Sequence, residues 1–300
     1  MLINSNARRL SMAMIACVLV IDLVWLPFSA LSFSAINIAV IAVIAVLPLL
    51  SQSIQRQHAF SAVTTNLAVE VYILVLFGAA GFVFSYLAVE SGWTVRDALF
   101  ADFDNALGFD WRNYTLFILN NDLLRPASLV LYVVSPMLVG FSLLWFCLDR
   151  KFHRASEIVA MVILGGILCV VLSAILPSAG GSGYFPADNS FYGGHKVIFD
   201  ESYKTFFFQL RDGAGMEISL LRPLALIAFP SYHACLSLVI ILAFRGTGRI
   251  GWLILALNIG SLLSLPVQGG HHLSDVLGGL LTGAIAYRVV RLHGGGSPAV

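Results

Sequence analysis

The chain has 300 residues, of which 59% are hydrophobic and 11% are charged, and its formal net charge is +1. Soluble domains carry roughly 25% charged residues, so this composition excludes an ordinary soluble globule. A net charge this close to zero gives no indication of a nucleic-acid partner. Several apolar stretches reach the ~20 residues that cross a bilayer, and the sequence therefore predicts an all-α polytopic membrane protein.

Eight apolar stretches are candidate membrane spans. In chain order we expect them at 10–31, 33–50, 66–89, 128–148, 157–177, 224–244, 250–266 and 273–291. A short hinge separates the first two, which are predicted to form an N-terminal hairpin within residues 1–65. Residues 66–293 then form the main transmembrane domain, with two long outer loops at 90–127 and 177–223. Residues 294–300 are predicted to be a flexible tail.

The two long loops differ in composition. The first contains VRDALFADFDNALGFDWRNYTLFIL, whose acidic and aromatic residues predict one or two helices at the membrane interface. The second is rich in glycine and aromatic residues, and we expect it to cap a site rather than form a folded domain. Trp93, Trp111 and the loop tyrosines are expected to anchor the loops at the membrane surface.

Basic residues are concentrated in the segments that lie opposite the two long loops in an eight-span topology. Ten of them fall there: Arg8, Arg9, Arg56, Arg150, Lys151, Arg154, Arg245, Arg249, Arg288 and Arg291. The positive-inside rule therefore places these short segments in the cytoplasm and the long loops on the non-cytoplasmic side.

Some ionisable and thiol groups lie inside predicted spans. Asp22 and Glu70 are functional candidates by default at such positions, or they pair across helices. The cysteines also lie in apolar runs, without a Cys-x-x-Cys pair, at Cys17, Cys147, Cys169 and Cys235. We read them as buried apolar residues, and we expect neither a disulfide nor a metal or other cofactor.

A proline, a serine and a histidine stand at the outer start of the sixth predicted span, in the sequence FPSYHACLSL. Pro230 suits the first helical position, so Ser231 and His233 are expected near the first turn. The free N–H groups and positive dipole end of a helix start suit a phosphate. Arg211 and Arg222 precede this helix and are candidate guanidinium donors to phosphate oxygens.

The stretch SLPVQGGHHLSDVLGG precedes and enters the eighth predicted span. His271 and Asp275 are four residues apart and share one face of a helical turn. The carboxylate can hold one imidazole nitrogen and leave the other free to react. His272 is three residues from Asp275 and competes for the same carboxylate. Because His233 also lies at an outer span end, two histidines and an aspartate are predicted to converge near one membrane surface.

Together these motifs resemble the type 2 phosphatidic acid phosphatase superfamily. FPSYHA matches that family's Pro-Ser-x-His, and the spacing of Ser264, His271 and Asp275 matches a later motif. Two positions depart from the pattern. Leu265 stands where the family has arginine, and Gly215 stands where a lysine precedes Arg-Pro, although the Arg-Pro pair itself is present.

The departures resemble the branch that includes inositol phosphorylceramide synthases, as do DNALGFDW at 104–111 and the Arg-Asp-Gly sequence that begins at Arg211. The resemblance covers roughly residues 97–290 and implies a six-helix core with two N-terminal spans added. It also implies a phosphohistidine on His271, oriented by Asp275, with His233 protonating the leaving group. The residues expected to bind the substrate phosphate are Arg211, Arg222, Ser231, Tyr232 and Gly270.

The leading hypothesis is an enzyme that transfers the phosphoryl group of a lipid phosphate at the non-cytoplasmic face. Its partners are the lipid substrate and membrane lipids. It is a lipid phosphate phosphatase if water resolves the intermediate, and a phosphotransferase if a lipid hydroxyl does so. One alternative is a transporter that uses His and Asp as a proton relay. Another is a metal-dependent membrane hydrolase, with His233, His271, His272 and Asp275 as ligands.

Overall fold

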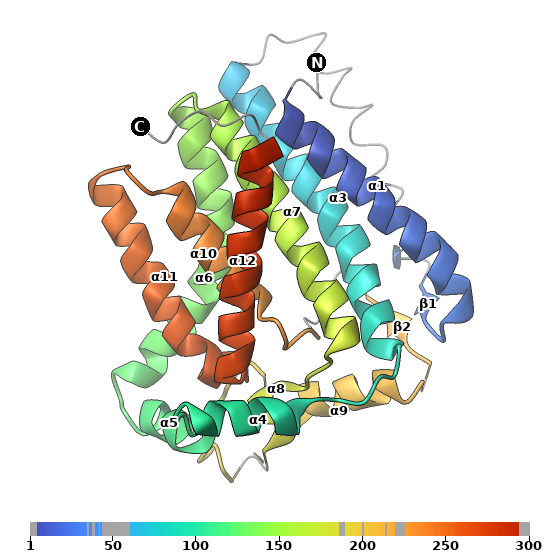
Figure 1. Ribbon diagram of the computed structural model, residues 1–300, viewed down its shortest axis with the longest axis vertical. Coiled ribbons are helices and arrows are strands. Elements are labelled where there is room, and N and C mark those ends of the chain that lie inside the picture. The colour runs from blue at the N-terminus through green and yellow to red at the C-terminus, as the bar shows by residue number, and fades with distance from the viewer. Residues whose placement is uncertain are drawn as a thin grey trace.

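The computed structural model describes residues 5–34, 36–37, 40–41, 43, 61–185, 190–199, 201–213, 215–219 and 226–293. Long helices form an upright bundle, and shorter helices lie across its lower end (Figure 1). The long ones are α1 (Asn6–Trp25), α3 (Ala62–Glu90), α6 (Leu124–Leu148), α7 (Phe152–Ile175), α11 (Arg249–Gln268) and α12 (Leu273–His293), with the shorter α10 (Tyr232–Ala243) among them.

The segments at the lower end come from both predicted outer loops and from the chain after α1. They are α4 (Asp97–Ala106), α5 (Trp111–Leu119), α8 (Gly180–Tyr184), α9 (Glu201–Arg211) and the 3-10 helix η1 (Leu26–Phe28). Strands β1 (Ser32–Phe33) and β2 (Glu217–Ile218) pair in parallel there, with Ser32 opposite Glu217. The one or two helices predicted in the first loop are α4 and α5, and the two loops share one end of the bundle (Figure 1).

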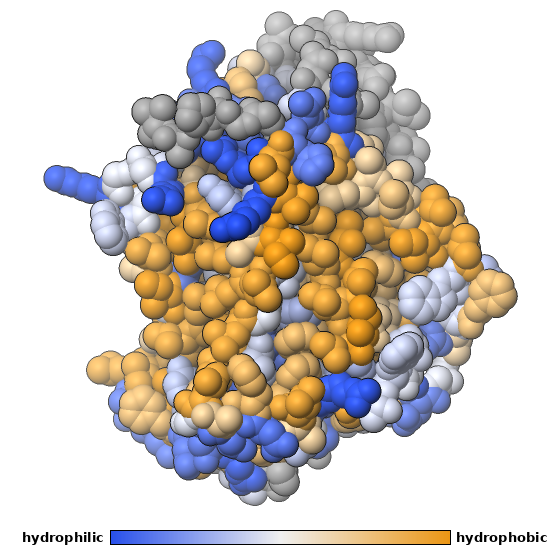
Figure 2. Space-filling model, viewed as in Figure 1, coloured by the Kyte–Doolittle hydropathy of each residue, from blue (hydrophilic) through white to orange (hydrophobic). Residues whose placement is uncertain are grey.

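Within the described residues, six helical segments are long and apolar enough to cross a membrane. They are Asn6–Phe28, Ala62–Glu90, Leu124–Leu148, Phe152–Tyr184, Arg249–Gln268 and Leu273–His293. On the face shown in Figure 2, an apolar belt crosses the middle of the bundle, with polar side chains gathered at both ends. The protein is an all-α, multi-pass integral membrane protein.

Two of the eight predicted spans need separate comment. The second, 33–50, lies mostly outside the described residues. The sixth was predicted to begin at residue 224, and this start is wrong, because α10 begins at Tyr232 and has 12 residues. Pro230 has no N–H to donate, and the Ser231 side chain caps the helix by accepting from Ala234, so the helix starts after them.

The main apolar core joins α1 to the rest of the bundle. Ile15 of α1 belongs to the same buried cluster as Val69 of α3 and Ile163 of α7. Glu70 confirms the expectation of pairing across helices. Its carboxylate accepts from Arg8 at 2.8 Å, joining α3 to α1, and a hydroxyl of α7 also contacts it.

The other ionisable group inside a span, Asp22, is different. It is 6% exposed, and neither carboxylate oxygen has a hydrogen-bond partner among the described residues.

Candidate active site

His271 lies in the turn just before α12 and Asp275 lies in the first turn of α12, and their side chains meet. Nδ1 of His271 is 3.4 Å from Oδ2 of Asp275, and both side chains are buried. The same oxygen accepts the backbone N–H of His272 at 2.8 Å, which fixes the carboxylate across the turn. A separation of 3.4 Å is long for a hydrogen bond, but catalytic contacts often tighten when substrate binds. Nε2 of His271 is left as the nitrogen available for chemistry.

Ser231 meets His271 from the start of α10. Its hydroxyl oxygen lies 3.2 Å from Nε2 of His271 and accepts the N–H of Ala234 at 3.4 Å. Because that oxygen accepts from Ala234, its own proton is available to Nε2. With Nδ1 directed to Asp275, these contacts favour the tautomer in which Nε2 carries a lone pair. A nucleophilic imidazole needs this form.

Glycines on α12 allow α10 to approach closely enough for this contact. A Cβ at Gly279 would overlap the carbonyl oxygen of Ser231, and one at Gly283 would lie 2.8 Å from the carbonyl oxygen of Cys235. Small residues four apart are a common means of close packing between membrane helices. The backbone N–H of Ser231 also donates to the carbonyl of Asp275 at 2.9 Å, so the starts of the two helices are tied together.

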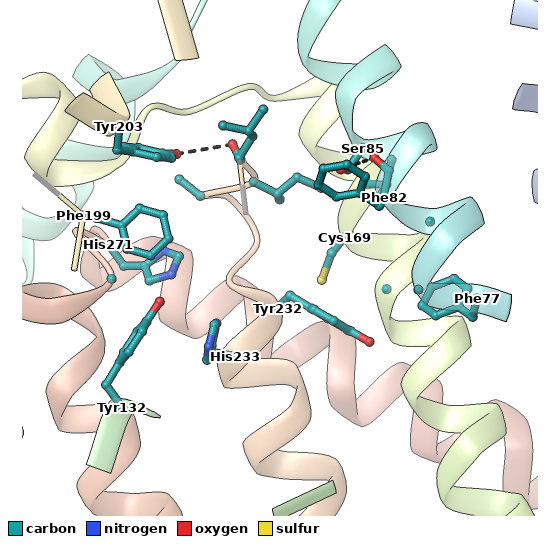
Figure 3. Close-up of a pocket in the computed structure, with 18 residues that line it drawn as sticks. Phe77, Phe82, Ser85, Tyr132, Cys169, Phe199, Tyr203, Tyr232, His233 and His271 are labelled. Carbon is teal, nitrogen blue, oxygen red and sulfur yellow. Dashed lines mark hydrogen bonds between the residues drawn. The ribbon is translucent and has the colours of Figure 1, made fainter. Parts of the chain in front are cut away.

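His233 and His271 line the same cavity (Figure 3). The His233 ring stacks on Tyr132 of α6, with ring centroids 4.7 Å apart and planes inclined by 22°. Figure 3 shows Tyr132 beside both histidines, with its hydroxyl directed towards His271. A Cβ at Gly269 would lie 2.7 Å from the His271 ring and 3.0 Å from the Tyr132 ring, so a glycine is needed there. The structure brings together the three residues predicted to be catalytic.

The cavity beside the histidines has a volume of about 300 Å³. Most of its wall is apolar or aromatic and comes from α3, α7 and the residues before α10: Phe77, Gly78, Gly81, Phe82, Gly166, Cys169, Val170, Leu226, Ile227 and Ala228. Phe199 and Tyr203 of the second outer loop also line it, as the predicted cap requires. Gly78 is exposed, and a Cβ there would meet nothing within 4 Å, so the cavity reaches the outer surface of α3.

His272 faces away from this cavity and lies between two carboxylates. Its Nε2 is 3.5 Å from Asp97 and its Nδ1 is 3.5 Å from Asp104, and all three side chains are buried. Burial alone would lower the pKa of His272, but the two carboxylates outweigh it and raise the pKa to about 9. His272 is therefore a cation that joins the first outer loop to α12. It does not compete for Asp275 through its ring.

Asp104 also caps α12 from a helix about 170 residues earlier in the chain. Its carboxylate accepts the N–H groups of Leu273 at 2.7 Å and Ser274 at 2.8 Å. Burial raises the pKa of Asp104, but hydrogen bonds from His272 and these N–H groups outweigh that effect, so the pKa lies below its ordinary value. Sequence reasoning gave Asp104 no role, and its only signal was its place in the DNALGFDW stretch.

Asp97 performs a similar task at the second loop. Its carboxylate accepts from the Ser178 hydroxyl at 2.7 Å and from the N–H groups of Ala179 and Gly180 at 3.0 and 3.1 Å. The two aspartates of α4 thus hold the start of the second loop, the start of α12 and His272 in one buried network. Because His271 directly precedes His272, this network fixes the backbone that carries His271.

Only some of the residues predicted to bind phosphate lie beside the histidines. Ser231 is at the histidines, whereas the Tyr232 hydroxyl donates to the carbonyl of Val162 at 3.0 Å, so only its ring faces the cavity. Arg211 does not line the cavity, because its guanidinium donates to the Trp93 carbonyl near the end of α3.

The remaining two predicted phosphate ligands are Gly270, which the structure describes, and Arg222, which it does not. Gly270 adopts φ +63° in the turn before α12, and its carbonyl accepts the N–H of Ser182 at 3.2 Å. A Cβ at Gly270 would overlap the Ser182 hydroxyl, which explains the glycine without a ligand. Arg222 lies outside the described residues.

Trp111 corrects the expectation that the loop tryptophans anchor the protein at the membrane surface. It is 2% exposed, and its indole N–H donates to the carbonyl of Pro266 at 2.9 Å. Its ring stacks between Phe185 and Phe191 of the second loop. The aromatic stacking and the buried hydrogen bond stabilise Trp111 in the interior more than a position at the membrane surface would. Trp93, in contrast, is 60% exposed.

A family model of the PAP2 superfamily matches residues 98–289, from α4 to the last part of α12. The chain belongs to the PAP2 superfamily. This is the type 2 phosphatidic acid phosphatase superfamily that the two histidine motifs resemble. No curated protein and no solved structure matches the chain.

PAP2 superfamily members are generally phosphatases and phosphotransferases, which indicates phosphatase-type phosphoryl transfer for this membrane protein. The match includes Asp104, His272, His271 and Asp275 of the buried network and the start of α10, whereas Asp97 lies just before it. It is a match to the superfamily as a whole, so the inositol phosphorylceramide synthase-like branch stays a prediction.

Proposed function

We propose that this PAP2 protein transfers the phosphoryl group of a lipid phosphate through a phosphohistidine on His271. The observation that carries the proposal is the shared cavity, which has two histidines at one end and an apolar wall over most of its length. A cavity of this kind suits an amphiphile with a phosphate head and a hydrocarbon tail. A small phosphate ester whose alcohol is polar has no group that would fill the apolar part. The opening at Gly78 lies within the membrane-spanning segment Ala62–Glu90, so a lipid can approach it from the bilayer.

The first step forms a bond from Nε2 of His271 to phosphorus and breaks the bond from phosphorus to the lipid oxygen. His233, in its protonated form, gives its proton to that leaving oxygen. Asp275 stabilises the positive charge that His271 gains when its Nε2 attacks. Such a covalent intermediate divides one difficult displacement into two easier ones.

The second step reverses these roles. An acceptor hydroxyl loses its proton to His233 and attacks phosphorus, the bond to His271 breaks, and the free histidine is restored. Water as acceptor makes the protein a lipid phosphate phosphatase. A lipid hydroxyl makes it a phosphotransferase, which the resemblance to inositol phosphorylceramide synthases favours.

Phosphate oxygens need donors at this site. The start of α10 offers backbone N–H groups and the positive end of its dipole beside Ser231. Among the described residues, no arginine or lysine lines the cavity. Arg222, which precedes the cavity-lining Leu226 by four residues, is our proposed source of a guanidinium.

The test uses purified protein in lipid nanodiscs with substrates labelled at phosphorus. Phosphatidic acid tests hydrolysis, and phosphatidylinositol with and without ceramide tests transfer. We expect turnover of at least one lipid phosphate, with labelled phosphohistidine trapped by acid-free quenching. His153→Ala, which removes an exposed histidine of α7, is the matched control for His271→Ala. Turnover that persists in His271→Ala, or that requires a metal ion removed by a chelator, would overturn the proposal.

A further inference from the structure

A second cavity, of about 310 Å³, lies at the other end of the bundle from the histidines. Its residues come from the start of α7, the end of α10 and the end of α12: Arg154, Glu157, Ile158, Met161, Leu242, Ala243, Arg245, Gly246, Tyr287 and Arg291. Asp275 and Arg291 are separated by about 24 Å of helix. The cavity is therefore separate from the proposed catalytic site.

Three guanidinium groups line this cavity, with one carboxylate among them. Arg291 pairs with Glu157 at 3.1 Å, which accounts for the carboxylate. Arg154 lies over the ring of Phe146, 5.8 Å from its centroid. Neither Arg154 nor Arg245 has a carboxylate within 4.0 Å among the described residues. The lining thus carries a formal charge of +2, which favours binding of an anion.

The floor of the cavity is apolar, whereas its rim is basic. Ile158 is buried and Met161 is 2% exposed, and Leu242 completes the apolar surface beneath the arginines. The end of α12, which carries Arg291, lies at the upper end of the bundle, and polar side chains gather at that end (Figures 1 and 2). Guanidinium groups pair with phosphate oxygens in a planar, often bidentate geometry. Basic pockets between membrane helices are sites at which anionic headgroups bind.

From these features we propose that the Arg154–Arg245–Arg291 cavity is a binding site for a phosphate group, distinct from the catalytic cavity. Two sources offer that chemistry, namely the headgroup of an anionic phospholipid and a soluble phosphate compound. The apolar floor adds contact area for the glycerol and upper acyl region of a lipid. A bound phosphate would bridge α7, the turn after α10, and α12. Helices α7 and α10 supply Cys169 and His233 to the catalytic cavity, and His271 lies just before α12.

The test compares two double variants that remove the same charge from the same end of the bundle. Arg154→Gln/Arg245→Gln removes the two cavity arginines that have no carboxylate partner. Arg249→Gln/Arg288→Gln removes two exposed arginines that do not line the cavity. Native mass spectrometry in detergent measures binding of phosphatidylglycerol, with phosphatidylcholine as the neutral reference. A parallel thermal unfolding series measures stabilisation by inorganic phosphate.

We expect the cavity variant to bind phosphatidylglycerol roughly ten-fold or more weakly than the parent, because two charge-assisted contacts are lost. The control variant keeps the parent affinity, and phosphatidylcholine binds weakly throughout. If inorganic phosphate stabilises the parent but not the cavity variant, and phosphatidylglycerol shows no such dependence, the ligand is soluble.

Two outcomes would overturn the proposal. Equal losses of phosphatidylglycerol affinity in the two double variants would mean that general surface charge attracts the lipid. If neither phosphatidylglycerol binding nor stabilisation by inorganic phosphate differs between the parent and the cavity variant, the cavity binds no phosphate. If the cavity double variant unfolds, Arg245→Gln and Arg249→Gln form a matched single pair, since both side chains are exposed. Because binding is measured without turnover, the result is independent of the proposed catalytic function.

Discussion

Ser231 and His271 are 40 residues apart in the chain, yet the Ser231 hydroxyl lies 3.2 Å from Nε2 of His271. This contact joins the start of α10, which carries His233, to the turn before α12, which carries His271. A serine at this place caps α10 and contacts Nε2 of His271, the nitrogen that we propose reacts with phosphorus. A phosphorus atom that bonds to Nε2 must take the space beside this hydroxyl, so substrate binding is expected to displace or redirect it.

Replacement of the two adjacent histidines should have different effects, one on activity and the other on stability. We expect His271→Ala to abolish turnover and phosphoenzyme formation while the protein melts near the parent temperature. His272→Ala should lower the melting temperature, because it leaves the buried carboxylates of Asp97 and Asp104 without their cation. Asp275→Asn should retain the fold and lose most activity, by favouring the wrong tautomer of His271.

Activity assays and thermal unfolding in the same detergent separate these outcomes. An active, folded His271→Ala together with a folded but inactive His272→Ala would show that the nucleophile is His272. The exposed His153 provides the control replacement.

The close approach of α10 to α12 depends on Gly279. A methyl group there would overlap the Ser231 carbonyl oxygen, so Gly279→Ala should push the two helix starts apart and reduce turnover at least about ten-fold. Gly140→Ala is the matched control, because a Cβ at that exposed glycine of α6 meets nothing within 4 Å. Parent-like turnover in Gly279→Ala would show that the spacing of the two helices does not limit catalysis.

The buried ion cluster around His272 predicts a pH dependence of stability. Its pKa is raised from an ordinary 6.5 to about 9, so its contribution is fully present below pH 6.5 and is lost between pH 6.5 and 9. The pKa of Asp104 is lowered, so its contribution disappears only in acid, below the ordinary carboxyl range. Thermal unfolding should therefore show a falling melting temperature from pH 6.5 to 9. In His272→Gln the fall of melting temperature with pH should be much smaller. An unchanged fall would contradict the assignment of His272 as the buried cation.

The sequence predicts the parts of the site that are local. The four-residue spacing of His271 and Asp275 correctly anticipates their contact. The helix itself begins later than expected, at Leu273, so His271 lies in the turn before α12 and only Asp275 lies on the helix. The approach of Asp97 and Asp104 to His272 could not be predicted, because it depends on how α4 packs beneath α12. For the same reason Trp111, which composition suggests is a surface anchor, is instead buried.

The orientation in the membrane remains a prediction from charge. We expect the lower end of the bundle, with the proposed active site, to face away from the cytoplasm. Reporter insertions at Arg150 and after His293 should both report the cytoplasm, because the turn between α6 and α7 and the end of α12 share the upper end (Figure 1). An insertion at Asp188, in the second outer loop and outside the described residues, should report the opposite side. A cytoplasmic signal at Asp188 would reverse the proposed substrate leaflet.

His233 should behave as a general acid rather than as the nucleophile. It lines the cavity with His271, and its ring is held against Tyr132 rather than against a carboxylate. Loss of a general acid costs most when the leaving group is poor, typically about 10²–10⁴-fold. His233→Ala should therefore be severely impaired on a lipid phosphate, whose leaving group is an alkoxide. It should be much less impaired on a nitrophenyl phosphate ester, whose leaving group needs no proton.

The comparison of two substrates and three variants decides the role of His233. His271→Ala should be inactive on both substrates, since neither can form a phosphoenzyme without the nucleophile. Tyr132→Phe, which keeps the stacked ring and removes the hydroxyl beside His271, shows whether ring packing alone sustains the acid. For each variant, the turnover rates on the nitrophenyl ester and on the lipid phosphate are measured at saturating substrate and expressed as a ratio of the two rates. Equal losses of His233→Ala on the two esters would leave this histidine as a residue that positions the phosphate.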